Sequence, residues 1–239
     1  MVDHRQAFNT STTQTRTKEF DAGLRAYMLK VYNYMASGVL LTGIVAMAVS
    51  QSPAMMQAIF GTPLQWVVML APFAFILAMN FGLQKMSAKT LQMVFWAFSA
   101  TMGLSLASIF VIYTGESIAR VFFITAAMFG GLSLYGYTTK KDLSGWGTFL
   151  FMGLIGIIIA MVVNIFLQSS MMQFIISVVG VLVFAGLTAY DTQKIKNMYA
   201  QVAHNSEMAG KAAIMGATSL YLDFVNLFMM LLSLFGNRE

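Results

Sequence analysis

Seven long apolar segments constrain the fold of this chain more than any other feature of its sequence. Each is close to the about 20 mainly apolar residues that a helix needs to cross the hydrocarbon core of a bilayer. Strands of a membrane barrel are about half as long and alternate in polarity, which these segments do not. We therefore predict an all-α integral membrane protein with seven transmembrane helices. The segments run approximately over Tyr27–Val49, Pro63–Leu83, Thr90–Tyr113, Ser117–Tyr137, Trp146–Phe166, Met171–Tyr190 and Ala212–Phe235.

The composition supports this class and excludes several kinds of site. Apolar residues make up 58% of the chain and charged residues 10%, whereas a soluble domain carries about 25% charged residues. Since there is no cysteine, disulfides, thiol catalysis and thiolate metal sites are excluded. The two histidines, His4 and His204, lie in polar segments, so we expect no histidine metal cluster. The sequence also lacks a nucleophile–base set, and we expect neither enzyme activity nor a cofactor.

The polar segments indicate how the chain lies in the bilayer. Residues 1–24 are rich in Ser, Thr and Gln, and we interpret them as a mobile cytoplasmic tail before a transmembrane domain of residues 25–239. Basic residues gather in this tail and in the connections after the second, fourth and sixth apolar segments. The positive-inside rule then places the N-terminus in the cytoplasm and the C-terminus outside. Because these charges are spread over short loops, we expect no nucleic-acid binding, which needs them on one face. The basic residues on this side are Arg5, Arg16, Lys18, Arg25, Lys85, Lys89, Lys140, Lys141, Lys194, Lys196 and Lys211.

Two carboxylates lie at positions where an ionisable side chain is costly in a membrane protein. Asp191 ends the apolar run of the sixth segment. Asp223 lies in the seventh, about 15 Å deep at the helical rise of about 1.5 Å per residue. The two positions are symmetric about residue 207, inside the polar connection. An antiparallel hairpin that turns there brings both carboxylates to the same depth, provided that the sixth helix continues to about Met198.

A pair of buried carboxylates has a definite chemistry. Both cannot ionise cheaply, so we expect the pair to share or hold a proton that a cation can replace. Hard oxygen ligands favour Ca²⁺ over soft metals, and Asn226, one turn from Asp223, is placed to add a carbonyl ligand or to fix a carboxylate. The alternative is that Asp191 and Asp223 only join two helices by hydrogen bonds. Asn164 and Gln168, near the outer end of the fifth segment, are expected to cap or pack.

Four blocks of the sequence resemble a known family. They are Val31–Gly38, Tyr135–Leu143, Ala189–Gln193 and Leu220–Phe228, and they reach from the first apolar segment to the last. The last two blocks contain Asp191 and Asp223. On these blocks the chain resembles the Bax inhibitor-1 family, also called the transmembrane Bax-inhibitor-motif family, and is most similar to its bacterial members.

The resemblance implies both a fold and an activity. The implied fold has seven helices, with the C-terminal helix central and the other six around it. The implied activity is a pH-sensitive calcium leak, in which Asp191 and Asp223 match the paired aspartates that act as the pH sensor. A basic residue near the cytoplasmic end of the second span latches one aspartate in the closed state, and Lys85 is the best match here. Lysine cannot form the bidentate fork that arginine forms in some relatives, so a Lys85 latch should be looser.

Our leading hypothesis is therefore a cation leak along the last helix, in a bacterial cytoplasmic membrane, with Ca²⁺ and protons as its ions. Proton sharing between Asp191 and Asp223 would gate it. The alternative is a regulatory partner of a membrane-bound ATP-dependent protease, a link that the resemblance carries and that the polar tail favours. A proton-coupled transporter is a third possibility, although the sequence shows no inverted repeat of broken helices.

Overall fold

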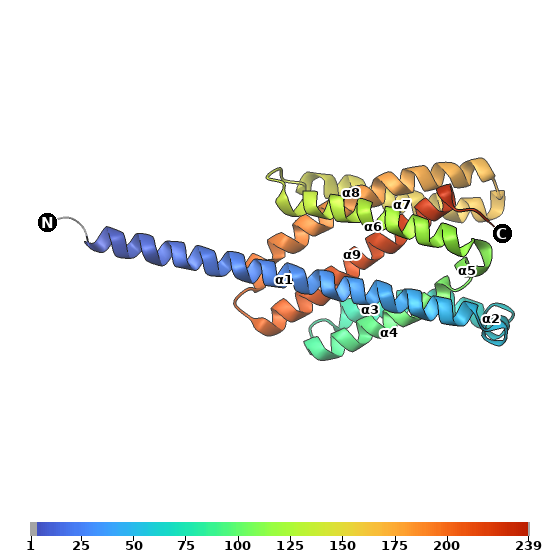
Figure 1. Cartoon of the computed structure of the whole chain (residues 1–239), viewed down its shortest axis with the longest axis horizontal. Coiled ribbons are helices and arrows are strands. Elements are labelled where there is room, and N and C mark those ends of the chain that lie inside the picture. The colour runs from blue at the N-terminus through green and yellow to red at the C-terminus, as the bar shows by residue number, and fades with distance from the viewer. Residues whose placement is uncertain (1–3, 239) are drawn as a thin grey trace.

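The structure is a computed structural model that describes the backbone of residues 4–238 and the side chains of residues 18–238. Within that part of the chain there are nine helices and no extended strand (Figure 1). The helices are α1 His4–Ser50, α2 Pro53–Phe60, α3 Leu64–Gly82, α4 Ala88–Leu106, α5 Ile109–Ile112, α6 Gly115–Thr138, α7 Ser144–Leu167, α8 Ser170–Val202 and α9 Ser206–Phe235.

Seven helical stretches are long and apolar enough to cross a membrane, which confirms the predicted number of spans. The third of them, Ala88–Ile112, consists of two helices, α4 and α5. The helix is interrupted between them at Ala107 and Ser108. The sequence reading missed this break, and it also missed α2. The latter is a short helix that starts at Pro53, where Ser52 caps the N-terminus by accepting a hydrogen bond from the Met55 amide.

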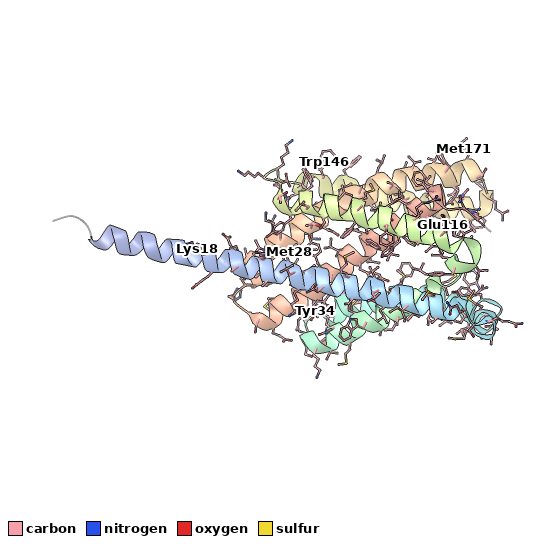
Figure 2. All side chains as sticks on the ribbon, in the orientation of Figure 1. Lys18, Met28, Tyr34, Glu116, Trp146 and Met171 are labelled. Atoms are coloured by element: carbon pink, nitrogen blue, oxygen red, sulfur yellow. The ribbon has the colours of Figure 1, made fainter. Side chains whose placement is uncertain are left out.

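The first helix differs most from its predicted bounds. It begins at His4, so residues 4–24, which were set apart as a polar tail, continue the first span as one helix. Residues 1–3 of that tail, and the side chains of residues 1–17, lie outside the described residues. Its mobility stays a prediction. Figure 2 shows Lys18 on a part of α1 that projects beyond the other helices, whereas Met28 lies where α1 reaches the bundle.

The C-terminal helix is the centre of the bundle. Figure 1 shows α9 running between a layer that contains α1, α3 and α4 and a layer that contains α6, α7 and α8. It packs directly against α8, α1, α6 and α4, while α3 and α7 lie further out and pack mainly on α4 and α8. The most apolar stretch of α9 is 56% buried, against at most 33% in the other spans. The central position that the resemblance implied is thus confirmed.

A buried polar contact joins α9 to α1. The side chain of Tyr221 is fully buried and its hydroxyl lies 2.7 Å from the Thr42 hydroxyl on α1. Its ring meets Phe95 and Phe98 of α4 edge to face. Aromatic pairs of this geometry add about 0.5–1.5 kcal/mol beyond their area burial.

Residues at the C-terminal end of α9 bond to the α5–α6 connection and to the first turns of α6. The short connection between α5 and α6 bonds to the residues that follow α9: the amide of Thr114 donates to the carbonyl of Asn237 over 3.1 Å. In return, the amide of Asn237 donates to the Ser117 hydroxyl over 2.9 Å. Arg120 also donates to the carbonyl of Phe235. These bonds satisfy polar groups at the end of a helix, where the last carbonyls have no partner in the helix itself.

Candidate functional site

The hairpin of α8 and α9 positions both aspartates. α8 continues well past the apolar run, to Val202, which confirms the extension on which the matched depth of the carboxylates depended. A short turn follows, and Asn205 caps α9 by accepting a hydrogen bond from the amide of Met208 over 3.0 Å. The two helices therefore run antiparallel and share the largest helix–helix interface of the described chain.

The structure brings Asp191 and Asp223 close enough for their charges to interact. Asp191 on α8 is half-buried, and Asp223 on α9 is only 5% exposed. The Oδ2 atom of Asp223 is fully buried and has no hydrogen-bond partner among the residues that the structure describes. A buried polar atom without a partner costs about 1–3 kcal/mol, so it calls for an explanation. The role of the pair as a pH sensor stays a prediction.

A cavity reaches Asp191 from the end of the bundle at which α3 ends and α9 begins. Its volume is about 730 Å³, and α3, α8 and α9 line it. Asp191 lies on its wall, whereas Asp223 is further in and is not part of the lining. Both polar and apolar residues line it: Asn80, Leu83, Gln84, Asp191, Lys194, Ile195, Met198, Gln201, Val202, Met208, Lys211, Ala212, Met215, Gly216 and Ser219.

Two lysines line this cavity, and neither of them is the expected Lys85. Lys194 follows Asp191 by three residues on α8, and its charge acts on the Asp191 carboxylate. The ammonium group of Lys211 on α9 donates a hydrogen bond to the carbonyl of Leu83 over 3.2 Å, and so connects α9 to the end of α3. Lys85, the latch candidate, lies exposed in the α3–α4 connection and is not part of the lining. Its latch role stays a prediction, and Lys194 and Lys211 are the lysines that line the cavity with Asp191.

The residue after Asp191 anchors α8 to two other helices. The hydroxyl of Thr192 lies 2.9 Å from the hydroxyl of Ser133 on α6, which lies 2.6 Å from the hydroxyl of Tyr32 on α1. Thr192 also bonds the carbonyl of Thr188, one turn back, over 2.7 Å. Ser133, Thr188 and Thr192 are buried. Each of these hydroxyls has a partner. The row of hydroxyls from Tyr32 through Ser133 to Thr192, here called the seam, therefore fixes the rotation of α8 at the depth of Asp191.

The next polar residue fixes the α6–α7 connection. The amide nitrogen of Gln193 donates to the carbonyl of Lys141, and its carbonyl accepts from the amide of Leu143, both over 2.8 Å. α6 can pack closely on α8 because Gly136 has no side chain. A side chain at this position would collide with the backbone of Ala189. The segments that carry the family resemblance, which are remote in sequence, therefore meet around Asp191.

The last expected partner is directed elsewhere. The side-chain nitrogen of Asn226 donates to the carbonyl of Leu222 in its own helix over 2.8 Å. Its proposed help to a carboxylate stays a prediction. In the described part of the chain, no three His, Cys, Asp or Glu side chains lie together as a metal site would require. The two carboxylates offer at most four of the 6–8 oxygens that Ca²⁺ takes, so water or backbone carbonyls would have to complete its shell.

At the other end of α9, a smaller polar cluster joins the α7–α8 connection to α9. The hydroxyl of Ser177, which is buried, donates to that of Ser233 over 3.0 Å, and Gln173 also donates to Ser233. Asn164 accepts from the amide of Ser169 and so closes the turn after α7. This confirms the structural role expected of Asn164. Gln168 adopts a left-handed conformation (φ 48°) at the end of α7, the usual way to end a helix.

Sequence reasoning missed Lys194 and Lys211 as residues of the cavity beside Asp191. The signal for Lys194 was present, since residues three apart on a helix lie on one face and Lys194 follows Asp191 at that spacing. No local signal was available for Lys211, because its place depends on how the α8–α9 hairpin approaches α3.

Comparison with known proteins agrees with this architecture. A family model described as "Inhibitor of apoptosis-promoting Bax1" matches residues 24–239. A protein of Rickettsia prowazekii is 48% identical over the whole length of both chains. Inner membrane protein YbhL of Escherichia coli is 48% identical over 91% of this chain and 94% of its own. A protein of Caulobacter vibrioides is 47% identical over 92% of each chain.

Proposed function

The chain belongs to the Bax inhibitor family of membrane proteins, and we propose that it forms a pH-sensitive leak pathway for calcium along α9, gated by Asp191 and Asp223. The observation that carries the proposal is the buried Oδ2 atom of Asp223, which lacks a hydrogen-bond partner among the described residues and lies beside a second carboxylate. If the two aspartates only joined α8 to α9 by hydrogen bonds, their buried oxygens would need hydrogen-bond partners, and one acidic side chain would be enough.

The gate acts through the charge of the pair. With one proton between them, the two carboxylates carry a single negative charge and can remain close to each other. Loss of that proton leaves two like charges in a medium of low polarity, where repulsion is strong. The repulsion is relieved either by separation of α8 and α9 or by a cation between the carboxylates. Uptake of Ca²⁺ should then rise as the pH rises.

The rest of the site supports such a gate. The seam from Tyr32 through Ser133 to Thr192 holds α8 in place next to Asp191, so that the charge of the pair, and not a loose helix, decides the separation. The cavity of about 730 Å³ gives ions from one side access as far as Asp191. An incomplete set of protein ligands also suits a leak, because an ion that leaves readily must not be bound by a full cage.

The test is uptake of ⁴⁵Ca²⁺ into liposomes that contain the purified protein, at pH 5 to 8. We expect uptake that increases with pH in the unaltered protein and that is lost in the Asp191→Asn/Asp223→Asn double variant. Asp142→Asn is the matched control, since Asp142 is exposed in the α6–α7 connection and its variant should behave as the unaltered protein does. Equal uptake by the double variant and the unaltered protein at every pH would sink the proposal.

A second candidate function is supported by the shape of α1. At about 1.5 Å per residue, its 47 residues extend about 70 Å, whereas the hydrocarbon core of a bilayer is about 30 Å thick. The projecting part in Figure 2 is thus available to a protein partner. This favours a regulatory partner of a membrane-bound ATP-dependent protease. Deletion of residues 1–17 should then abolish capture of the protease from mild detergent while ⁴⁵Ca²⁺ uptake is unchanged, and recovery of the protease by the truncated protein would refute this role.

The setting of the protein follows from the same relatives. We place it in a bacterial inner membrane with the N-terminus on the cytoplasmic side, because the relative YbhL is named an inner membrane protein and the basic connections lie at one end of the bundle. We assign it no enzymatic role, in keeping with the lack of a nucleophile–base set in its sequence.

A further inference from the structure

The cavity beside Asp191 opens between two parts of the fold that do not support each other closely. Its walls are the end of α3 on one side and the α8–α9 hairpin on the other. α3 packs mainly on α4 and α2 rather than on this hairpin. The hydrogen bond from Lys211 to the carbonyl of Leu83 links the two sides. A molecule from the bilayer can therefore reach the cavity from between the helices.

The charge of the lining favours an anion. It contains two ammonium groups, on Lys194 and Lys211, and one carboxylate, on Asp191. Lys194 is exposed and Lys211 is half-buried, so both are near the opening of the cavity and near the ends of the spanning segments. The side chains of Gln84 and Gln201 add uncharged hydrogen-bond donors. A phosphate group at this opening would find hydrogen-bond donors on several sides.

The remaining lining is apolar, which narrows the class of anion. Met198, Met208 and Met215 contribute flexible apolar side chains that adapt to irregular ligands. A small inorganic anion would leave these surfaces uncovered. We propose that the cavity binds an anionic phospholipid, with its phosphate on Lys194 and Lys211 and its acyl chains along the methionines. Basic pockets between spans on one side of a membrane are typical sites for such headgroups.

Binding of this lipid would change the charge next to Asp191, and the binding does not require that the protein conduct ions. Lys194 follows Asp191 by three residues, so the two side chains lie on one face of α8. A phosphate on Lys194 would bring negative charge close to Asp191, while the binding itself can be measured whether or not the protein conducts ions.

The experiment measures bound lipid directly by native mass spectrometry of the detergent-solubilised protein, titrated with phosphatidylglycerol or with phosphatidylcholine of the same chains. We expect the unaltered protein to retain phosphatidylglycerol in preference to phosphatidylcholine. At about 1 kcal/mol per basic side chain near the surface, Lys194→Gln/Lys211→Gln should weaken binding about 30-fold. Lys89→Gln/Lys140→Gln, which removes two exposed charges outside the cavity, should leave it unchanged.

Two further arms keep the result decisive. Lys194→Arg/Lys211→Arg keeps both charges and should retain the lipid, which separates a charge effect from loss of the fold. Inorganic phosphate should not displace the lipid at equal concentration, because it lacks the apolar part. Equal retention by the Gln variant and the unaltered protein, equal retention of the two lipids, or displacement by inorganic phosphate would each overturn the proposal. A protein that binds lipid but shows no ⁴⁵Ca²⁺ uptake would refute the leak and leave the lipid site standing.

Discussion

Replacement of Asp223 by leucine should stabilise the protein, although Asp223 is buried at the centre of the bundle. The side chain is 5% exposed, and its Oδ2 atom has no hydrogen-bond partner in the described part of the chain. Leucine is close to aspartate in shape, removes the unpaired oxygen and ends the interaction with the charge of Asp191. An unsatisfied buried polar atom costs about 1–3 kcal/mol, so Asp223→Leu should regain about that amount. At about 3 °C per kcal/mol this raises the midpoint of thermal unfolding by about 3–9 °C.

Thr192→Val is the matched comparison, and it should have the opposite sign. Thr192 is as deeply buried, but its hydroxyl bonds both Ser133 and the carbonyl of Thr188. Valine keeps the shape and loses two hydrogen bonds, at about 0.5–1.5 kcal/mol each, so the midpoint should fall by about 3–9 °C. Asp142→Asn, at an exposed position, should stay within about 0.5 kcal/mol of the unaltered protein.

The assay is intrinsic tryptophan fluorescence during heating in detergent, because the chain has three tryptophans and no cysteine for a thiol-reactive dye. The reasoning is refuted if Asp223→Leu lowers the midpoint as Thr192→Val does. That outcome would mean that Asp223 joins two helices by hydrogen bonds, the alternative that the sequence left open.

Three further outcomes follow from contacts near the site. Gly136→Val should cost about 1–3 kcal/mol, measured by the same heating assay, because the new side chain meets the backbone of Ala189 and separates α6 from α8; an unchanged midpoint would show that this contact is loose. Lys194→Gln should alter the pH profile of ⁴⁵Ca²⁺ uptake more than Lys85→Gln, because only the former faces the cavity; a larger effect of Lys85→Gln would restore the expected latch. Tyr199→Ala should speed tryptic cleavage of the N-terminal part of α1, because the ring of Tyr199 packs on two aromatic side chains of that helix; unaltered cleavage would place its anchor elsewhere.

The spans were predictable because hydropathy is a local property. A helix that crosses lipid must satisfy its backbone hydrogen bonds internally and present apolar side chains, so length and composition suffice to find it. The matched depth of Asp191 and Asp223 was predicted on the condition that the sixth helix continue to about Met198, and α8 meets that condition because it extends to Val202. The docking of Asn237 on Thr114 was not predictable, because it depends on where the end of a remote helix lies. The break at Ala107 was not predicted either.

The choice of the basic neighbour shows the same limit at the site. The resemblance pointed to the end of the second span, and Lys85 is the lysine that the sequence places there. The structure instead leaves the Lys85 side chain exposed and brings Lys211, more than 100 residues away, to the end of α3. Spacing along one helix can be read from a sequence, as for Asp191 and Lys194, whereas the approach of two helices depends on the packing of the whole bundle.

The pattern of satisfied and unsatisfied groups around the pair is the strongest reason to treat it as functional. Thr188 and Thr192 are buried within one turn of Asp191 on α8, Ser133 on α6 is buried beside Thr192, and each has a hydrogen-bond partner. The fold is therefore able to satisfy polar atoms at this depth. That it leaves one oxygen of Asp223 without a protein partner is a local cost in an otherwise satisfied region. Proteins tolerate such costs where activity requires them, and the opposite signs expected for Asp223→Leu and Thr192→Val separate that case from simple helix packing.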